Sequence, residues 1–162
     1  ERIDYEYERN GVSNLLMLFA PLEGWRPVKV TDRHTKVDWA QLIKELVDEH
    51  HPKKKIILVM DNLNTHKLGS LYEAFEPAEA RRIADRLEIH YTPTHGSWLD
   101  MAEIEIGVLS RQCLDRRLPD QETLKREINA WQDTRNQKAI RVDWRFTAED
   151  ARTKLKSLYP SI

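Results

Sequence analysis

The sequence predicts an α/β fold in which helices flank one mixed β-sheet. Antiparallel strand patterns fill the first thirty residues, and strand and helix patterns alternate after residue 35. An antiparallel start followed by alternating units indicates helices packed on a sheet that contains both strand orientations. Because the chain has 162 residues, 40% of them hydrophobic and 33% charged, we expect one domain over residues 1–162, with C-terminal helices from about residue 119.

The N-terminal part predicts a meander of three antiparallel strands. Residues 3–8 alternate apolar and acidic side chains, which is the two-residue period of a half-buried strand. Asn10-Gly11 favours a tight hairpin turn, because both residue types tolerate positive φ. We therefore expect the returning strand over residues 12–19 and a third strand over residues 25–30.

The middle of the chain predicts helices and strands in alternation. Thr35 and Asp38 form a capping box at the start of a helix that ends near Pro52. The elements expected next are a strand over residues 56–60, helices over residues 70–75 and 77–86, and a strand over residues 87–91. The uninterrupted apolar run from Ile56 to Met60 is typical of a strand buried on both faces.

The C-terminal part is predicted to be mainly helical. A helix is expected from Trp98, because apolar residues recur at helical spacing after it. These residues are Ala102, Ile106, Leu109 and Cys113. Asp120 is expected to cap a further helix, and the capping box of Thr147 and Asp150 to begin the last one.

The composition excludes several classes of protein. No run approaches the roughly 18 consecutive apolar residues of a membrane span. Cys113 is the only cysteine, which excludes an internal disulfide and a cysteine-based zinc site and makes a cytoplasmic location the expectation. The net charge of −1 does not indicate nucleic-acid binding, but from Arg111 onward 12 Lys and Arg face 8 Asp and Glu, a basic excess that permits phosphate contacts.

Two carboxylates are the main candidates for chemistry. Asp61 directly follows the strand over residues 56–60, and open α/β folds place ligand sites at such strand ends. Glu103 lies at the margin of the apolar stripe of its helix, whereas Glu105 is expected to point outward. Held together, Asp61 and Glu103 would repel each other unless a cation compensated, and carboxylate oxygens suit magnesium or manganese. The alternatives are an ordinary turn at Asp61 and a solvated carboxylate at Glu103.

Three motifs carry a resemblance to a known family. They are residues 61–66 (DNLNTH), residues 90–99 (HYTPTHGSWL), and Glu103 with residues 108–112 (VLSRQ). With these motifs the chain resembles the catalytic domain of bacterial insertion-sequence transposases, in the mariner-like superfamily of DDE transposases. Asp61 matches the second catalytic aspartate of that family, and Glu103 matches its third acidic residue.

The resemblance implies a ribonuclease H-like fold in which three carboxylates hold two Mg²⁺ or Mn²⁺ ions. Asp61 and Glu103 would be catalytic and metal-binding residues. Water and then a DNA 3′-hydroxyl would attack phosphodiesters, so the implied partners are DNA, as element ends and target, and further copies of the protein in a transposition complex. The residues implied to contact DNA or to support the metal ligands are Asn62, His66, His95, Ser97, Trp98 and Arg111.

The chain departs from the family pattern at two places. The first catalytic aspartate of the family lies on a strand before the hairpin, and Asp4 belongs to the hairpin itself. We therefore expect an N-terminally truncated domain that lacks the first strand and is inactive or severely impaired. Asp100 stands where the family usually has Asn. Two other functions stay open, namely a ribonuclease H-like nuclease without strand transfer and a non-catalytic remnant that binds DNA or a protein partner.

Overall fold

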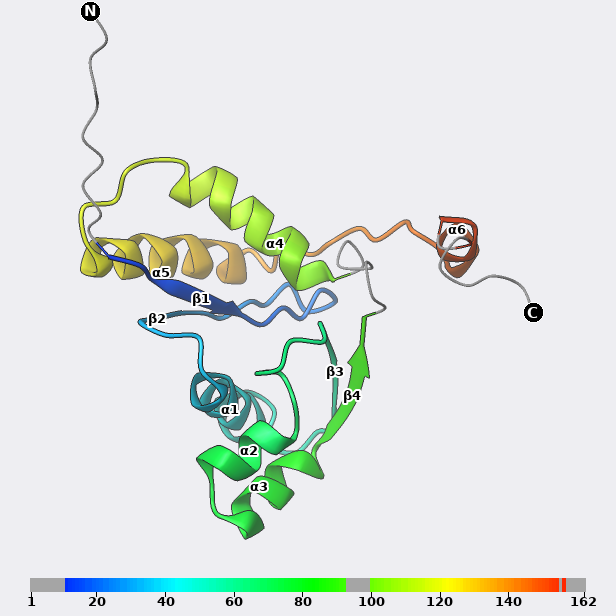
Figure 1. Cartoon of the computed structure of the whole chain (residues 1–162). Coiled ribbons are helices and arrows are strands. Elements are labelled where there is room, and N and C mark those ends of the chain that lie inside the picture. Colours follow the sequence, from blue (N-terminus) through cyan, green and yellow to red (C-terminus); the bar gives the residue numbers. More distant parts are fainter. Residues whose placement is uncertain (1–10, 93–99, 155, 157–162) are drawn as a thin grey trace, which may run out of the picture.

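The computed structural model describes residues 11–92, 100–154 and 156 (Figure 1). Its strands and α-helices are β1 (Asn14–Met17), β2 (Val28–Thr31), α1 (Lys36–Glu45), β3 (Ile56–Met60), α2 (Gly69–Ala74), α3 (Pro77–Ala84), β4 (Leu87–Tyr91), α4 (Met101–Leu109), α5 (Gln121–Gln137) and α6 (Ala148–Lys154). The strand predicted over residues 3–8 lies outside the described residues. No helix of the described part is both long and apolar enough to cross a membrane.

The strands form two pairs. β1 and β2 are antiparallel, with Asn14 opposite Thr31 and Met17 opposite Val28. β3 and β4 are parallel, and Ile56 lies opposite Leu87. The α/β class and the mixture of strand orientations are confirmed. Within the described residues the four strands form two separate pairs, because no strand there joins β1 to β3.

Local sequence signals place the starts of α1 and α5 correctly, whereas α4, which was expected from Trp98, begins at Met101 because Asp100 is its extended N-cap. Thr35 caps α1: its Oγ1 accepts from the Asp38 N–H at 3.2 Å, and its own N–H donates to Asp38 Oδ2 at 2.9 Å. After Glu45 the helix continues as a π-helical turn, Leu46–His50, which ends before Pro52 as predicted. In the same way Asp120 caps α5 by accepting from the Thr123 N–H at 2.6 Å.

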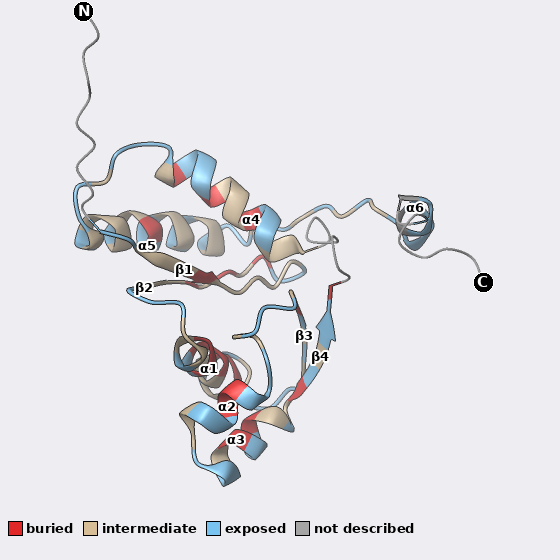
Figure 2. Cartoon of the chain, viewed as in Figure 1, coloured by how far each residue is buried: buried red, intermediate tan, exposed pale blue. Residues whose placement is uncertain are grey.

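β3 is buried on one face only, so the prediction of burial on both faces is wrong. Ile56 and Leu58 pack against the core formed with α1, α2 and α3. Ile57 and Val59 point the other way and are 67% and 53% exposed. The physical reason is that the described helices near β3 and β4 all lie on one side of this pair, as Figures 1 and 2 show.

Two hydrophobic cores correspond to the two strand pairs. The larger one joins α1, α2 and α3 to β3 and β4, and its fully buried side chains include Ile43, Leu71 and Ile83. The smaller core joins β1 and β2 to α4, α5 and the π-helical turn Ser110–Leu114. Val28, Leu109, Cys113 and Ile128 are buried in it. The helix that carries Glu103 is therefore packed on β1 and β2, whereas Asp61 belongs to the other pair.

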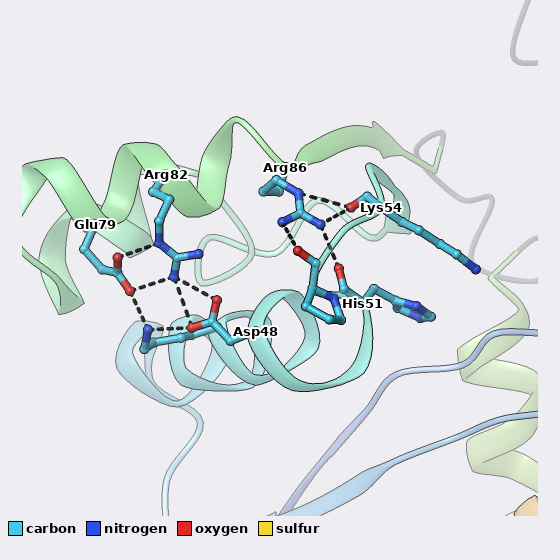
Figure 3. A network of polar contacts seen from close by, with 8 residues as sticks. Asp48, His51, Lys54, Glu79, Arg82 and Arg86 are labelled. Carbon is cyan, nitrogen blue, oxygen red and sulfur yellow. Dashed lines mark hydrogen bonds and ion pairs between the residues drawn. The ribbon is translucent and has the colours of Figure 1, made fainter.

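A polar network fixes the end of α1 and its π-helical turn against α3 (Figure 3). Arg82 contacts Glu79 at 2.7 Å and Asp48 at 2.8 Å, and Lys44 contacts both carboxylates. Hydrogen bonds from Arg82 and Lys44 lower the pKa of Glu79 to about 2. Arg86 donates to the carbonyls of residues 51, 52 and 54, which hold the chain that leads into β3.

Candidate active site

Asp61 lies at the carboxyl end of β3 and is held by a histidine. Its side chain is 41% exposed, and its Oδ1 lies 2.6 Å from Nδ1 of His66. The His66 ring stacks on Trp39, with 6.1 Å between centroids, and meets the edge of His34 at 5.6 Å. Tyr91 donates from its hydroxyl to the His66 carbonyl at 3.2 Å. The loop after β3 is thus arranged so that one imidazole fixes the orientation of the Asp61 carboxylate.

Glu103 lies in the first turn of α4, and its side chain is exposed. Asp100 begins this helix, because its Oδ1 accepts from the Ala102 N–H at 2.9 Å. An aspartate at this position is a favourable N-cap, and it also places a second carboxylate one turn before Glu103.

One cavity brings these side chains together. It has a volume of about 660 Å³. Its lining includes the polar side chains of Asp61, His66, Asp100 and Glu103, while β1, β3, α1 and α4 supply apolar walls. Burial raises the pKa of Asp100, and the negative charges of Asp61 and Glu103 raise it further, although the backbone N–H groups of Ala102 and Glu103 act in the opposite direction. Asp61 and Glu103 therefore lie close enough to Asp100 for their charges to act on it.

The carboxylates that line the cavity are donors of the kind that a hard divalent cation prefers. The described residues contain no group of three His, Cys, Asp or Glu side chains that could hold a metal ion. Mg²⁺, however, is commonly bound by one or two carboxylates, with water and substrate phosphates as the other ligands. Asp61 and Glu103 supply such a partial set, and a cation would offset the repulsion that Asp100 experiences.

The other predicted site residues in the described part of the chain are not among those that line the cavity. Asn62 is exposed in the loop next to Asp61. Arg111 is exposed eight residues after Glu103, about 12 Å farther along the helical axis, and does not line the cavity. His95, Ser97 and Trp98 lie outside the described residues.

Glu105 was predicted to point outward, and this prediction is wrong. Its side chain is 2% exposed and forms ion pairs with Arg26 and Arg135, each at 2.8 Å. The reason is that the buried seam of α4 and the π-helical turn after it runs through Glu105, Leu109 and Cys113, four residues apart. It does not run through Ala102 and Ile106, which are half-buried. The spacing from Leu109 was the sequence signal that could have placed Glu105 inside.

Three charged side chains join α4 to α5 and to the segment before β2. They are Arg26, Glu105 and Arg135, and we name this group the anchor. Arg26 follows the turn between β1 and β2 and is fully buried. Its backbone N–H donates to Asn136 Oδ1 at 2.8 Å, and the Asn136 amide donates back to its carbonyl at 3.0 Å. Burial lowers the pKa of Arg26, against the opposing effect of Glu105. The anchor therefore fixes the position of the helix that presents Glu103.

Asp100→Asn is expected to stabilise the metal-free protein at neutral pH. Asn keeps the N-cap acceptor and removes a charge that burial, Asp61 and Glu103 make unfavourable. Because the pKa of Asp100 is raised in the folded state, the stability gain of the variant is complete at neutral pH. It shrinks as the pH falls through the raised folded-state pKa of Asp100, and it is gone below about 3.9, the ordinary aspartate value. Thermal unfolding between pH 3.5 and pH 7 measures this dependence.

The matched control is Asp120→Asn in the N-cap of α5. Hydrogen bonds from Thr123 lower the pKa of Asp120, so its charged form is favoured in the folded protein. Replacement there should lower the stability slightly at neutral pH, and this loss should vanish in acid. If both variants shifted the unfolding midpoint at pH 7 in the same direction, the repulsion at Asp100 would be disproved.

Comparison with known proteins identifies the family. The family described as DDE superfamily endonuclease matches residues 1–125, which is most of the chain. Searches of curated proteins and of solved structures found no match. The matched range contains Asp61, Asp100 and Glu103, together with all elements from β1 to α4. The chain is thus a member of the DDE superfamily endonuclease family.

Proposed function

We propose that the chain is the catalytic domain of a DNA transposase of the mariner-like, insertion-sequence type, which cleaves DNA phosphodiesters and transfers the strand. The observation that supports this function best is that Asp61 and Glu103 both line a single cavity. Family membership supplies the reaction class, since endonucleases of this superfamily act on DNA.

Asp61 and Glu103 are the proposed ligands of Mg²⁺ or Mn²⁺, two ions in the complete site. When bound, the divalent ions neutralise charge on the phosphate and orient the attacking and leaving oxygens. His66 keeps Asp61 in one orientation through its 2.6 Å contact. Supporting partners of this kind commonly change metal affinity by about 10–100-fold when they are removed.

The proposed reaction has two displacements at phosphorus. A water oxygen bonds to phosphorus as the P–O3′ bond breaks, which leaves a 3′-hydroxyl and a 5′-phosphate. That 3′-hydroxyl then attacks a target phosphodiester, forms a new P–O3′ bond and releases the 3′-hydroxyl of the target strand. The contribution of the protein is to position the groups and to stabilise charge, as in phosphoryl transfer generally.

DNA contacts are proposed for the surface around Asp61 and Glu103. Asn62 is exposed beside Asp61 and offers amide groups to a phosphate. His95, Ser97 and Trp98 precede α4 in sequence, and we propose that they contact DNA or support the metal ligands, as the family resemblance implies. Arg111 begins the basic C-terminal part of the chain and is proposed to contact the DNA backbone farther from the reacting phosphate.

Asp61→Asn and Glu103→Gln are each expected to weaken Mn²⁺ binding by at least about tenfold. The reason is that each variant replaces one of the two proposed carboxylate ligands with a neutral amide. Titration calorimetry with Mn²⁺ measures the affinity directly. Nicking of supercoiled DNA in Mg²⁺ or Mn²⁺ tests hydrolysis, and covalently joined products distinguish strand transfer from cleavage alone.

The control variant is Glu76→Gln, which removes an exposed carboxylate at the start of α3, outside the cavity. It should bind Mn²⁺ as the parent chain does. Unchanged Mn²⁺ affinity in both Asp61→Asn and Glu103→Gln would refute the metal site, and with it the proposed catalytic function.

A further inference from the structure

The segment that joins α5 to α6 has the side-chain pattern of a strand. We name residues 141–146 the arm. Exposed charged side chains alternate in it with half-buried apolar ones, which is the two-residue period of a strand. The charged residues are Arg141, Asp143 and Arg145, and the apolar residues are Val142, Trp144 and Phe146. The arm belongs to neither of the two strand pairs in the described part of the chain.

One edge of β4 is open within the described residues, because β3 is its only neighbour there. At the edge shared with β3, the Thr92 N–H donates to the Met60 carbonyl at 2.9 Å, so even-numbered residues of this strand direct their backbone groups to β3. Backbone groups alternate in direction along a strand. The N–H and C=O groups of Leu87, Ile89 and Tyr91 therefore face the open edge, which can accept a further strand.

The arm matches this edge residue by residue when the two run antiparallel. The opposing pairs are then Leu87 with Phe146, Glu88 with Arg145, Ile89 with Trp144, His90 with Asp143, and Tyr91 with Val142. Three of these pairs join apolar or aromatic side chains, one joins opposite charges, and one joins a histidine to a carboxylate. Cross-strand pairs of these kinds stabilise neighbouring strands.

This register also agrees with the two faces of β4. Leu87 and Ile89 pack on the larger core, and residues directly opposite each other point to the same face. The apolar side chains of the arm would therefore turn to the core side. Its charged side chains would lie on the other face, beside Glu88 and next to the exposed Ile57 and Val59 of β3. The arm would thus keep its charges in solvent and bury more of its apolar side chains.

Charge selects the antiparallel direction. The arm carries an ion pair between Arg145 and Asp143 at 2.6 Å, and β4 carries a contact between His90 and Glu88 at 3.0 Å. In the antiparallel register Arg145 would lie between two carboxylates, those of Asp143 and Glu88, and His90 would lie between the same two. A parallel arrangement would instead set Asp143 opposite Glu88, and like charges in that position are destabilising.

We propose that the arm of one copy adds to β4 of a second copy, and that the second copy returns its own arm in a two-fold dimer. The arm does not pair with β4 of its own chain. Figure 1 shows that it leads away from the end of α5 and that α6 lies apart from the other helices. Reciprocal exchange of an identical element closes a dimer and leaves neither β4 edge open. The proposal goes beyond the proposed function and does not depend on metal or DNA binding.

Sedimentation of the full chain with charge-reversed variants tests this surface. We expect the parent chain to form a dimer and Arg145→Glu to weaken dimerisation by at least about tenfold, because each of the two exchanged arms then sets a carboxylate opposite Glu88. Combining Arg145→Glu with Glu88→Arg should restore the dimer, since the opposite charges are only exchanged. The control is Arg126→Glu, which reverses an exposed charge on α5 and should leave the dimer unchanged.

Disulfide trapping tests the register and the origin of the arm. A Glu88→Cys chain is mixed with a separately tagged Arg145→Cys chain, so a bond between them is intermolecular. Because odd-numbered residues of β4 would form the edge hydrogen bonds, Glu88 and Arg145 would be a non-hydrogen-bonded pair with Cα atoms about 4.5 Å apart, within disulfide range. An Asp143→Cys chain is the control, since its diagonal position is about 7–8 Å away. Cys113 is buried, and the parent chain alone controls for its thiol.

The expected result is linked chains for Glu88→Cys with Arg145→Cys, and few or none for Glu88→Cys with Asp143→Cys. A parent chain that stays monomeric, a dimer that Arg145→Glu leaves unchanged, or the absence of linked chains would overturn the proposal. Equal trapping with Asp143→Cys would overturn the register. A disulfide inside one chain that carries both Glu88→Cys and Arg145→Cys would place the arm on its own β4, which overturns the exchange. None of these readouts involves Mn²⁺, so they are separate from the test of the proposed function.

Discussion

Glu105→Ala is expected to lower the free energy of unfolding by about 3–5 kcal/mol, the range seen when one partner of a buried ion pair is removed. Arg26 is fully buried and Arg135 is 14% exposed, and both direct their charge at Glu105 Oε1. Alanine would leave two guanidinium groups in a poorly solvated place with no compensating carboxylate. Urea unfolding followed by circular dichroism measures the loss.

Glu103→Ala is the matched control, because it removes the same side chain two residues earlier on α4 from an exposed position. Its effect should stay within about 0.5 kcal/mol, as for most surface substitutions. Glu105→Gln should fall between the two, since an amide oxygen can still accept from Arg135. Equal midpoints for Glu105→Ala and Glu103→Ala would contradict the structural role given to the anchor.

Gly24→Ala is expected to be comparably damaging, with a loss of at least about 2–3 kcal/mol from backbone strain together with overpacking. Gly24 has φ of +69° in the turn between β1 and β2. A Cβ atom there would lie 2.4 Å from both the carbonyl carbon and the carbonyl oxygen of Ala139. Both contacts are with backbone atoms just beyond α5, so relief would require the turn and the helix end to move apart.

Gly11→Ala separates strain from overpacking. Gly11 also has positive φ, at +110°, but a Cβ atom there would meet nothing within 4 Å among the described residues. We expect a cost of only about 1–2 kcal/mol for this variant, measured by the same urea titration. A Gly24→Ala variant as stable as Gly11→Ala would show that the turn does not pack tightly on Ala139.

The parts of the fold that depend on short-range chemistry could be predicted from the sequence. The capping boxes at Thr35 and Thr147 form as expected, because each is completed within four residues. β3 and β4 have the predicted bounds, since a compact apolar run defines β3 and an alternation of apolar and polar residues defines β4. The exposure of Ile57 and Val59 could not be read from the same run, because burial depends on which elements cover each face.

In the candidate site, too, contacts between residues close in sequence could be predicted, whereas contacts between distant residues could not. The contact between Asp61 and His66 joins residues five positions apart in one loop. The placing of Asp61 and Glu103 in one cavity depends on the packing of two strand pairs, and only the resemblance anticipated it. Glu105 was misplaced because its partners, Arg26 and Arg135, come from distant parts of the sequence. The roles of Asp61 and Glu103 remain predictions for the metal titration.

The helix start at Asp100 has a consequence at the level of the gene. Asp100 both begins α4 through the Ala102 N–H and adds a carboxylate beside Asp61 and Glu103. Asparagine alone retains the shape and the cap of this side chain while losing its charge. Aspartate and asparagine codons differ by one base, so a single transition is enough to exchange a repulsive site for a neutral one without disturbing the helix. Selection on metal binding could therefore act at this codon independently of selection on the fold.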